Sequence, residues 1–247
     1  TKDFTEFRRV ETVIHDAAAA LPGLTPDRAR LAADGDIQQR DKDGLEIDQG
    51  IFLAHVLAHP AAGAHLCHAM LLPRPEALER QPHYRERGRL DLDGARVERR
   101  GKASFVTMRN RRFLNAEDES TIDDLEIAVD LATLDGTDIA VLRGDTVEHP
   151  KFLGKRLFSA GINLTHIYHG KISYVWYIKR EMGLVNKMFR GVARPEVSPD
   201  EIYGGTAEKP WIAAVDGFAI GGGCQILLVM DYILAASDAY MTLPARK

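Results

Sequence analysis

The stretch AVDGFAIGGGCQ, residues 214–225, decides the fold of this 247-residue chain. It joins a short apolar strand, a turn, three consecutive glycines and the start of a helix. Consecutive glycines cost conformational order, so they mark a place where the backbone turns tightly or where something approaches it. Three interpretations are open: a tight turn with close packing, a loop that binds nucleotide phosphates, and a site whose backbone N–H groups bind an oxyanion.

The spacing of the glycines disfavours both nucleotide interpretations. The run does not follow G-x-G-x-x-G, and no G-K-[S/T] is present. The N–H groups at a helix start have no partner inside the helix, so that of Gly222 can bind a developing enolate oxygen. We expect a second donor from FSAGINL, residues 158–164, where Gly161 frees the backbone and exposes the N–H of Ile162. Taken alone, each segment also fits an ordinary strand-to-helix loop.

Three segments in this order resemble the crotonase (enoyl-CoA hydratase/isomerase) superfamily. They are VTMRNRRFLNAEDESTIDDL (residues 106–125), FSAGINL and AAVDGFAIGGGCQ, and the resemblance covers about residues 95–247. It implies an α/β fold, a crotonase-like spiral of ββα units, and an acyl-CoA substrate. It also implies an enolate held by the N–H groups of Ile162 and Gly222. A homo-oligomer, either a trimer or a dimer of trimers, is expected from the same resemblance.

The rest of the chain agrees with this fold class. Alternating patterns predict strands and helices in the order typical of a mainly parallel sheet. The strands are expected near residue 97 and at 103–108, 139–143, 211–215 and 231–237, and the helices at 122–132, 171–190 and 222–230. The chain stops in the strand-like YMTLPARK, so we expect a fragment whose C-terminal part is missing.

Residues 1–90 have a different, helical character. Phe7, Val10, Ile14 and Ala17 share one helix face. Thr25 is expected to cap a second helix with Pro26 at its first position, and a third helix covers residues 51–59. We therefore predict a helical N-terminal extension over residues 1–90 and a truncated crotonase-like core over residues 91–247.

The site departs from the family's hydratases. Their two catalytic glutamates are replaced by Gln225 and Ala245, and the aspartate common in isomerases is replaced by Asn163. Neither an amide nor a methyl group shuttles protons at neutral pH, so hydration is disfavoured. These departures resemble an oxygen-using branch of the family, which oxidises an aryl-acetyl-CoA with dioxygen, releases CoA and needs no metal or organic cofactor. Another crotonase-type activity (thioester hydrolysis or decarboxylation) and a non-catalytic or RNA-binding relative remain alternatives.

Several further residues are candidates for the site. Ile162, Gly222 and Gln225 are the expected catalytic residues. Substrate contacts are expected from Glu117, His149, Arg180 and Ala245, although the first three also fit solvated positions. The basic residues Lys151, Lys155 and Arg156 suit either the phosphates of CoA or a solvated face.

Composition restricts the partners. The net charge of −4 disfavours nucleic acid and anionic membranes as partners, and no apolar run reaches about 18 residues. With two cysteines there is no disulfide framework, which favours the cytoplasm. The motifs HVLAH (residues 55–59) and HLCH (residues 65–68) are the metal-ligand candidates, but the first lacks the glutamate of HExxH. We therefore expect no metal site.

Overall fold

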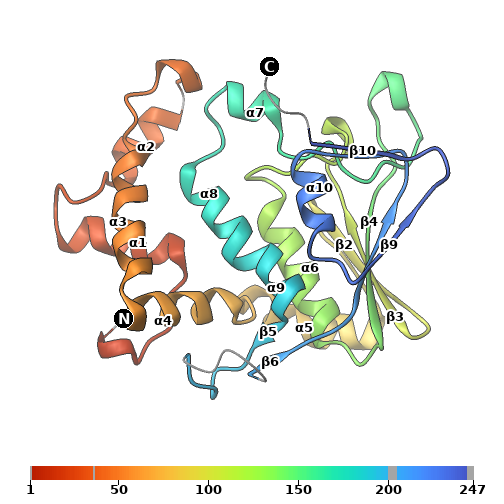
Figure 1. Ribbon diagram of the computed structural model, residues 1–247, viewed down its shortest axis with the longest axis horizontal. Coiled ribbons are helices and arrows are strands. Elements are labelled where there is room, and N and C mark those ends of the chain that lie inside the picture. Colours follow the sequence, from red (N-terminus) through yellow and green to blue (C-terminus); the bar gives the residue numbers. More distant parts are fainter. Residues whose placement is uncertain (1, 36, 200–204, 244–247) are drawn as a thin grey trace. The chain divides into compact units, whose positions relative to one another are not determined.

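The computed structural model describes residues 2–35, 37–199 and 205–243 (Figure 1). Its contacts divide the chain into two compact units. Unit 1 comprises residues 1–72, 164–183 and 193–206, and unit 2 comprises residues 73–163, 184–192 and 207–247. The chain therefore passes repeatedly from one unit to the other. The predicted division into residues 1–90 and 91–247 stays a prediction.

Unit 1 is helical. Its elements are η1 (Lys2–Phe4), α1 (Val10–Ala20), α2 (Arg28–Gly35), η2 (Gln39–Asp41), α3 (Glu46–Ala58), α4 (Pro60–Leu71), α7 (Leu164–Tyr168) and α8 (Tyr174–Lys179). Its core consists of buried residues from three helices, namely Val10, Ile14, Leu53, Leu66 and Met70. Val175 and Ile178 of α8 pack against this core. A segment far along the sequence thus completes it.

One predicted cap in unit 1 is wrong. The second helix begins at Arg28 instead of Pro26. Asp27 Oδ1 accepts a hydrogen bond from the Arg30 N–H at 2.9 Å, which is the geometry of a helix cap. Thr25 lies further upstream with a buried side chain. Because Asp and Thr are both good caps, the sequence pattern alone did not separate them.

Unit 2 contains a six-stranded mixed sheet, in the order β1-β2-β3-β4-β7-β9. The strands are β1 (Arg89–Asp91), β2 (Ala95–Arg100), β3 (Ala103–Met108), β4 (Ile139–Gly144), β7 (Trp211–Val215) and β9 (Tyr232–Ala235). β1 to β3 pair antiparallel, whereas β3, β4, β7 and β9 are parallel neighbours. The register places Phe105 opposite Val141 and Leu142 opposite Ala213. The carboxyl ends of β4 and β7 therefore meet at one edge of the sheet.

Helices and short strands complete unit 2 (Figure 1). They are α5 (Pro75–Arg87), η3 (Arg111–Phe113), α6 (Ile122–Leu134), η4 (Pro150–Phe152), α9 (Asn186–Arg190), β8 (Phe218–Ile220), α10 (Gly222–Leu227) and β10 (Tyr240–Thr242). The π-helical η5 (Arg180–Val185) and the two-stranded pair β5 (Val192–Ala193) and β6 (Thr206–Ala207) lie where the chain passes between units. α6 packs on β2 and β3, and its apolar residues Ile122, Leu125, Val129 and Ala132 are buried.

The predicted α/β class is confirmed, with two differences in detail. The helix expected over residues 222–230 ends at Leu227. Residues 218–220, expected to be a turn, form β8 and pair in parallel with β10. Among the described residues no single helix is long and apolar enough to cross a membrane. Helix α3 and the segment Pro60–Arg87 pass that test only as a pair bent by 107°.

Candidate active site

The first predicted donor loop, residues 158–164, is clamped along one side by residues 115–118. The Glu117 N–H donates to the Gly161 carbonyl at 2.7 Å, and the Asn163 N–H donates to the Glu117 carbonyl at 2.9 Å. These bonds make an isolated parallel bridge between Glu117 and Ile162. In such a bridge the N–H and C=O of the central residue point to the opposite side. The N–H of Ile162 therefore points away from the Glu117 backbone, and the described residues offer it no hydrogen-bond partner.

The second predicted loop lies directly beside the first. Ser159 and Ala219 form a parallel bridge, in which Ser159 donates to the Phe218 carbonyl and Ile220 donates to the Ser159 carbonyl. Gly222 is the first residue of α10. A Cβ at Gly222 would lie 3.3 Å from the Ile162 nitrogen and 3.3 Å from Oε1 of Glu117. The structure thus brings both predicted donors and the Glu117 carboxylate together.

Gly161 lies where the two loops pass close to each other. Its φ of +83° is in the left-handed region, and a Cβ there would lie 2.3 Å from the Ile220 oxygen and 2.8 Å from the Gly222 nitrogen. No other residue type has both the conformational freedom and the space for this position. The glycine is required by the backbone approach as well as by the turn.

A buried polar network that sequence reasoning missed supports the first loop. Asn115 Nδ2 donates to the Asp145 and Leu157 carbonyls, each at 2.8 Å. Asp118 Oδ2 accepts from Asn163 Nδ2 at 2.8 Å and from Asn110 Nδ2 at 2.9 Å. Asn163, which stands at the isomerase aspartate position, is therefore a buried donor to a carboxylate. The only sequence signal was the polar run at residues 115–118, whose partners lie far along the chain.

The other predicted site residues have different environments. Gln225 lies in the first turn of α10 with an exposed side chain, and its N–H donates to the Gly221 carbonyl at 3.1 Å. His149 is half-buried and precedes η4, where its Nδ1 accepts from the Lys151 N–H at 3.3 Å. Arg180 is buried and pairs with Glu181, but it belongs to unit 1, so its substrate contact stays a prediction. Ala245 lies outside the described residues.

An apolar cluster packs among the segments around the donor loops. Val147, Leu157 and Phe218 are buried, and Leu114, Phe152, Ala160 and Ile220 pack against them. The Phe152 ring lies 5.7 Å from that of Phe218 and 6.0 Å from that of His149. His149 is therefore connected to the second loop through neighbouring aromatic rings.

The three basic residues near the first loop have different environments. Lys151 and Lys155 are exposed. Arg156 donates from Nη1 to the Gly144 carbonyl at 2.6 Å, at the end of β4. Its guanidinium therefore helps to hold the strand end, and a contact with CoA phosphates stays a prediction for all three residues.

The histidine motifs of unit 1 have structural partners. His59 Nδ1 accepts from the Ala62 N–H at 3.3 Å and caps α4. His65 and His68 are buried against the Phe7 ring, with centroids 4.6 Å and 4.9 Å away. Burial lowers the pKa of His68. Within the described ranges no group of three His, Cys, Asp or Glu side chains is placed to hold a metal ion. The expectation of a metal-free site stays a prediction.

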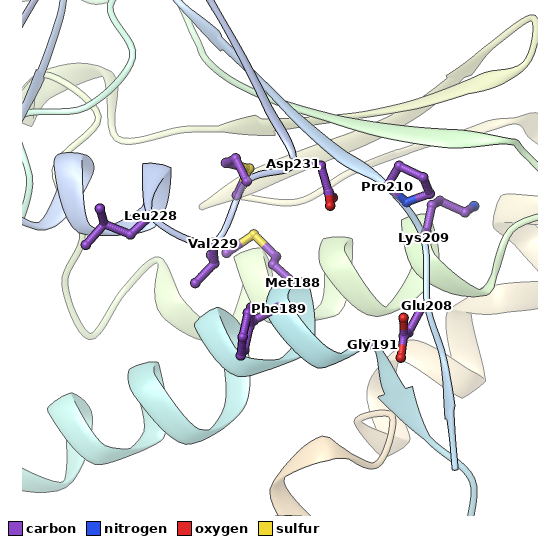
Figure 2. Close-up of a pocket in the computed structure, with 10 residues that line it drawn as sticks. Met188, Phe189, Gly191, Glu208, Lys209, Pro210, Leu228, Val229 and Asp231 are labelled. Carbon is purple, nitrogen blue, oxygen red and sulfur yellow. The ribbon is translucent and has the colours of Figure 1, made fainter. Parts of the chain in front are cut away.

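A separate pocket of about 320 Å³ lies at the amino ends of β7 and β9 (Figure 2). Lys209 lines it, and its Nζ donates to the Ala132 and Asp135 carbonyls at 2.7 and 2.9 Å, at the end of α6. Asp231 Oδ2 accepts from the Trp211 N–H at 2.7 Å. Both polar groups therefore serve the fold, and the pocket lies at the sheet edge opposite the donor loops.

Comparison with known proteins gives three findings. Residues 98–247 match the family model described as enoyl-CoA hydratase/isomerase. The chain is 45% identical over 243 residues to the (3,5-dihydroxyphenyl)acetyl-CoA 1,2-dioxygenase of Amycolatopsis orientalis, covering 98% of this chain and 55% of the relative. It is 29% identical to the short-chain-enoyl-CoA hydratase of Clostridium acetobutylicum, covering 61% of this chain and 49% of the relative.

Solved structures of similar proteins cover a comparable part of the chain. The enoyl-CoA hydratase from Thermoplasma volcanium GSS1 is 22% identical with a TM-score of 0.47, and the match covers 61% of this chain and 51% of that one. The chain thus spans about half the length of the relatives that it matches.

Proposed function

The chain belongs to the enoyl-CoA hydratase/isomerase family. From that premise we propose that its activity is that of a dioxygenase acting on an aryl-acetyl-CoA thioester. The proposed substrates are 3,5-dihydroxyphenylacetyl-CoA and dioxygen. The proposed products are 3,5-dihydroxyphenylglyoxylate and free CoA. The near-complete match of this chain to a relative with that named activity supports the choice of substrate.

The observation that carries the proposal is the convergence of two backbone donors beside a buried carboxylate. The Ile162 N–H points away from the Glu117 backbone. Gly222 begins α10 close to the Ile162 nitrogen. A thioester oxygen bound between them would be stabilised as it becomes an enolate oxygen. In enzymes that stabilise an oxyanion, each such donor contributes roughly 3–4 kcal/mol to the stabilisation of the transition state.

The residues that replace the hydratase glutamates favour an oxygen reaction over hydration. Gln225 is neutral and exposed in the first turn of α10, and Ala245 carries only a methyl group. Neither can activate a water. An amide also adds no negative charge that would oppose a carbanion.

The proposed reaction needs only the enolate and oxygen. The α-carbon lies between an electron-rich ring and a thioester, so its proton is unusually acidic. After that proton leaves, the carbanion reduces dioxygen, and the resulting peroxide attacks the thioester carbonyl and expels CoA. The O–O bond of the cyclic peroxide formed in this way then breaks as the second α-proton leaves. The two oxygen atoms end in the keto and carboxyl groups of the arylglyoxylate, and no metal or organic cofactor takes part.

The ring hydroxyls are assigned to the remaining polar residues. We place Glu117 and His149 against them, and the contact expected from Arg180, which belongs to unit 1, stays a prediction. Glu117 has the strongest support because its buried Oε1 lies beside Gly222. The active protein is proposed to be a homo-oligomer, a trimer or a dimer of trimers, as the family membership suggests.

The test follows oxygen and CoA together. Full-length protein, exhaustively treated with chelator, is incubated with 3,5-dihydroxyphenylacetyl-CoA while dissolved oxygen and free thiol are recorded. We expect equal molar oxygen uptake and CoA release. CoA release without oxygen uptake identifies a thioester hydrolase instead, and no change in either identifies a binding relative.

An anaerobic control isolates the enolate step. Without oxygen, the α-protons of the substrate should exchange with deuterium from the solvent in the presence of the protein. Exchange without later oxygen uptake would keep the oxyanion site and reject the dioxygenase. Activity that chelation abolishes and added metal restores would reject the cofactor-free reaction.

A further inference from the structure

We propose that Ser159 is a positioning residue whose hydroxyl holds the two donor loops in their working geometry. The proposal rests on the proposed function only in that the two N–H groups bind a thioester oxygen. Ser159 is fully buried at 0% exposure, and it lies in the first loop two residues before Gly161. It is therefore a group that does not touch substrate and acts through its neighbours.

Ser159 is bonded to three separate segments. Its Oγ accepts from the Gly161 N–H at 2.9 Å and donates to the Asn115 carbonyl at 3.0 Å. Its own N–H donates to the Phe218 carbonyl at 3.1 Å, and its carbonyl accepts from the Ile220 N–H at 3.0 Å. Ser159 thus connects residues 115–118, the first loop and the strand β8 that leads into the second loop.

The Ser159 hydroxyl restrains the backbone conformation of Gly161, which has no side chain to restrict it. Gly161 is bonded on both sides, since its N–H goes to Ser159 Oγ and its carbonyl to the Glu117 N–H. Together these bonds fix the φ and ψ angles of Gly161. The peptide that follows Gly161 carries the Ile162 N–H, so the same two bonds set the direction of that donor.

The second loop also contacts Ser159. A Cβ placed on Gly223 would lie 3.0 Å from the Ser159 Cβ and 3.3 Å from its Oγ. The start of α10 therefore rests on this side chain. A change at Ser159 should therefore alter the position of both donors.

Removal of the hydroxyl leaves the Gly161 N–H buried without a partner. Buried unpaired donors are unfavourable, and a glycine peptide can rotate to relieve the loss. Because such a rotation changes the φ of Gly161, it shifts the following peptide, which carries the Ile162 N–H and is then held only through the Gly161 carbonyl. Loss of a whole oxyanion donor lowers kcat by about 10²–10³-fold, so a misdirected one should lower it by about 10–100-fold. We expect KM to change less than about 3-fold, because the loss is realised mainly in the transition state.

The experiment measures the thioester carbonyl directly. Full-length wild-type and Ser159→Ala proteins are each saturated with 3,5-dihydroxybenzoyl-CoA carrying a ¹³C-labelled carbonyl, an analogue without an α-proton. Infrared difference spectra then give the carbonyl stretch. We expect a shift to lower frequency in the wild type, and at least half of that shift should be lost in the variant with similar binding affinity.

Ser104→Ala is the matched control. Ser104 is also fully buried, and its Oγ bonds Thr137 Oγ1 at 2.7 Å and Asp135 Oδ2 at 3.1 Å, near the amino end of β3. Its loss should lower the melting temperature while the carbonyl shift and kcat stay at wild-type values. Ser159→Cys replaces the hydroxyl by a slightly larger thiol that hydrogen-bonds more weakly, and an intermediate shift is expected. It is the variant to measure if Ser159→Ala does not fold.

The outcomes separate the positioning role from the oxyanion site itself. No carbonyl shift in the wild type would reject the oxyanion site and therefore the proposed function. A wild-type shift that persists unchanged in the folded Ser159 variants, with unchanged kcat, would reject the positioning role alone. A shift that Ser104→Ala also reduces would reject it too, because any buried hydroxyl would then have the same effect.

Discussion

Replacement of Gly161 by alanine should separate the two donor loops and lower turnover far more than stability. The new Cβ would start 2.3 Å from the Ile220 oxygen and 2.8 Å from the Gly222 nitrogen. A relaxed carbon–oxygen contact needs roughly 3.3 Å, so the loops must move apart by about 1 Å. The obstacle is backbone on both sides, so no side chain can simply rotate away.

The magnitudes follow from that displacement. A misplacement of about 1 Å in a reacting geometry costs about 10²-fold in rate. The φ of +83° adds strain of about 1–2 kcal/mol for a residue with a Cβ. We therefore expect kcat to fall at least about 10²-fold while the protein still folds with a lower melting temperature.

Gly101→Ala is the matched control for the strain alone. Gly101 also has a positive φ, +57°, in the turn between β2 and β3, but a Cβ there meets nothing within 4 Å. It should lose about 1–2 kcal/mol of stability, a few degrees in melting temperature, and keep its kcat. The assay is steady-state CoA release beside thermal unfolding of both variants.

Two results would refute the reasoning. If Gly161→Ala folds and turns over at the wild-type rate, the approach of the two loops does not set the donor geometry. If Gly101→Ala loses as much turnover as Gly161→Ala, the rate loss reflects general destabilisation. In either case the close backbone contact would have no role in catalysis.

Other predictions concern the buried charges and the polar network of unit 2. Lys187 is fully buried and its Nζ lies 2.8 Å from Glu126 and 2.7 Å from Asp130, so Lys187→Met should cost about 3–5 kcal/mol of unfolding free energy at pH 7, measured in urea. Burial raises the pKa of Asp130 to about 6, above its ordinary value, so its contribution to stability is greatest below about pH 4 and is lost as the pH rises through 6. Wild type should therefore lose stability relative to Asp130→Asn between pH 4 and 7, and a constant difference would contradict this. Asn115→Ala should cost about 2–4 kcal/mol, because two buried carbonyls lose their donor and alanine must adopt a φ of +55°, whereas Asn115→Gly should recover the backbone part of that loss.

The sequence predicted those elements whose signal is local. The strands at residues 103–108, 139–143 and 211–215 were found because each contains a short run rich in apolar residues, most of which are buried or half-buried in the sheet. β8 was missed because three residues after a glycine read as a turn, and only pairing with β10, far along the chain, makes them a strand.

The candidate site was predicted in the same way. The glycines indicated the N–H groups of Ile162 and Gly222, because a glycine itself marks a position where another group can approach the backbone. The support from Ser159 and Asn163 was not predictable, because their partners Asn115 and Asp118 lie 44 and 45 residues away in the sequence. A hydroxyl or amide in a loop does not reveal which distant carbonyl or carboxylate it will meet.

The interleaving of the two units has a consequence for how the protein is made. The core of unit 1 includes Val175, Ile178 and Met182 beside residues from α1, α3 and α4. During synthesis the helices of residues 1–72 leave the ribosome long before these partners, with part of their apolar surface uncovered. An N-terminal fragment ending near residue 90 would be incompletely folded and prone to aggregation. A recombinant chain meant to yield unit 1 must therefore extend at least past α8.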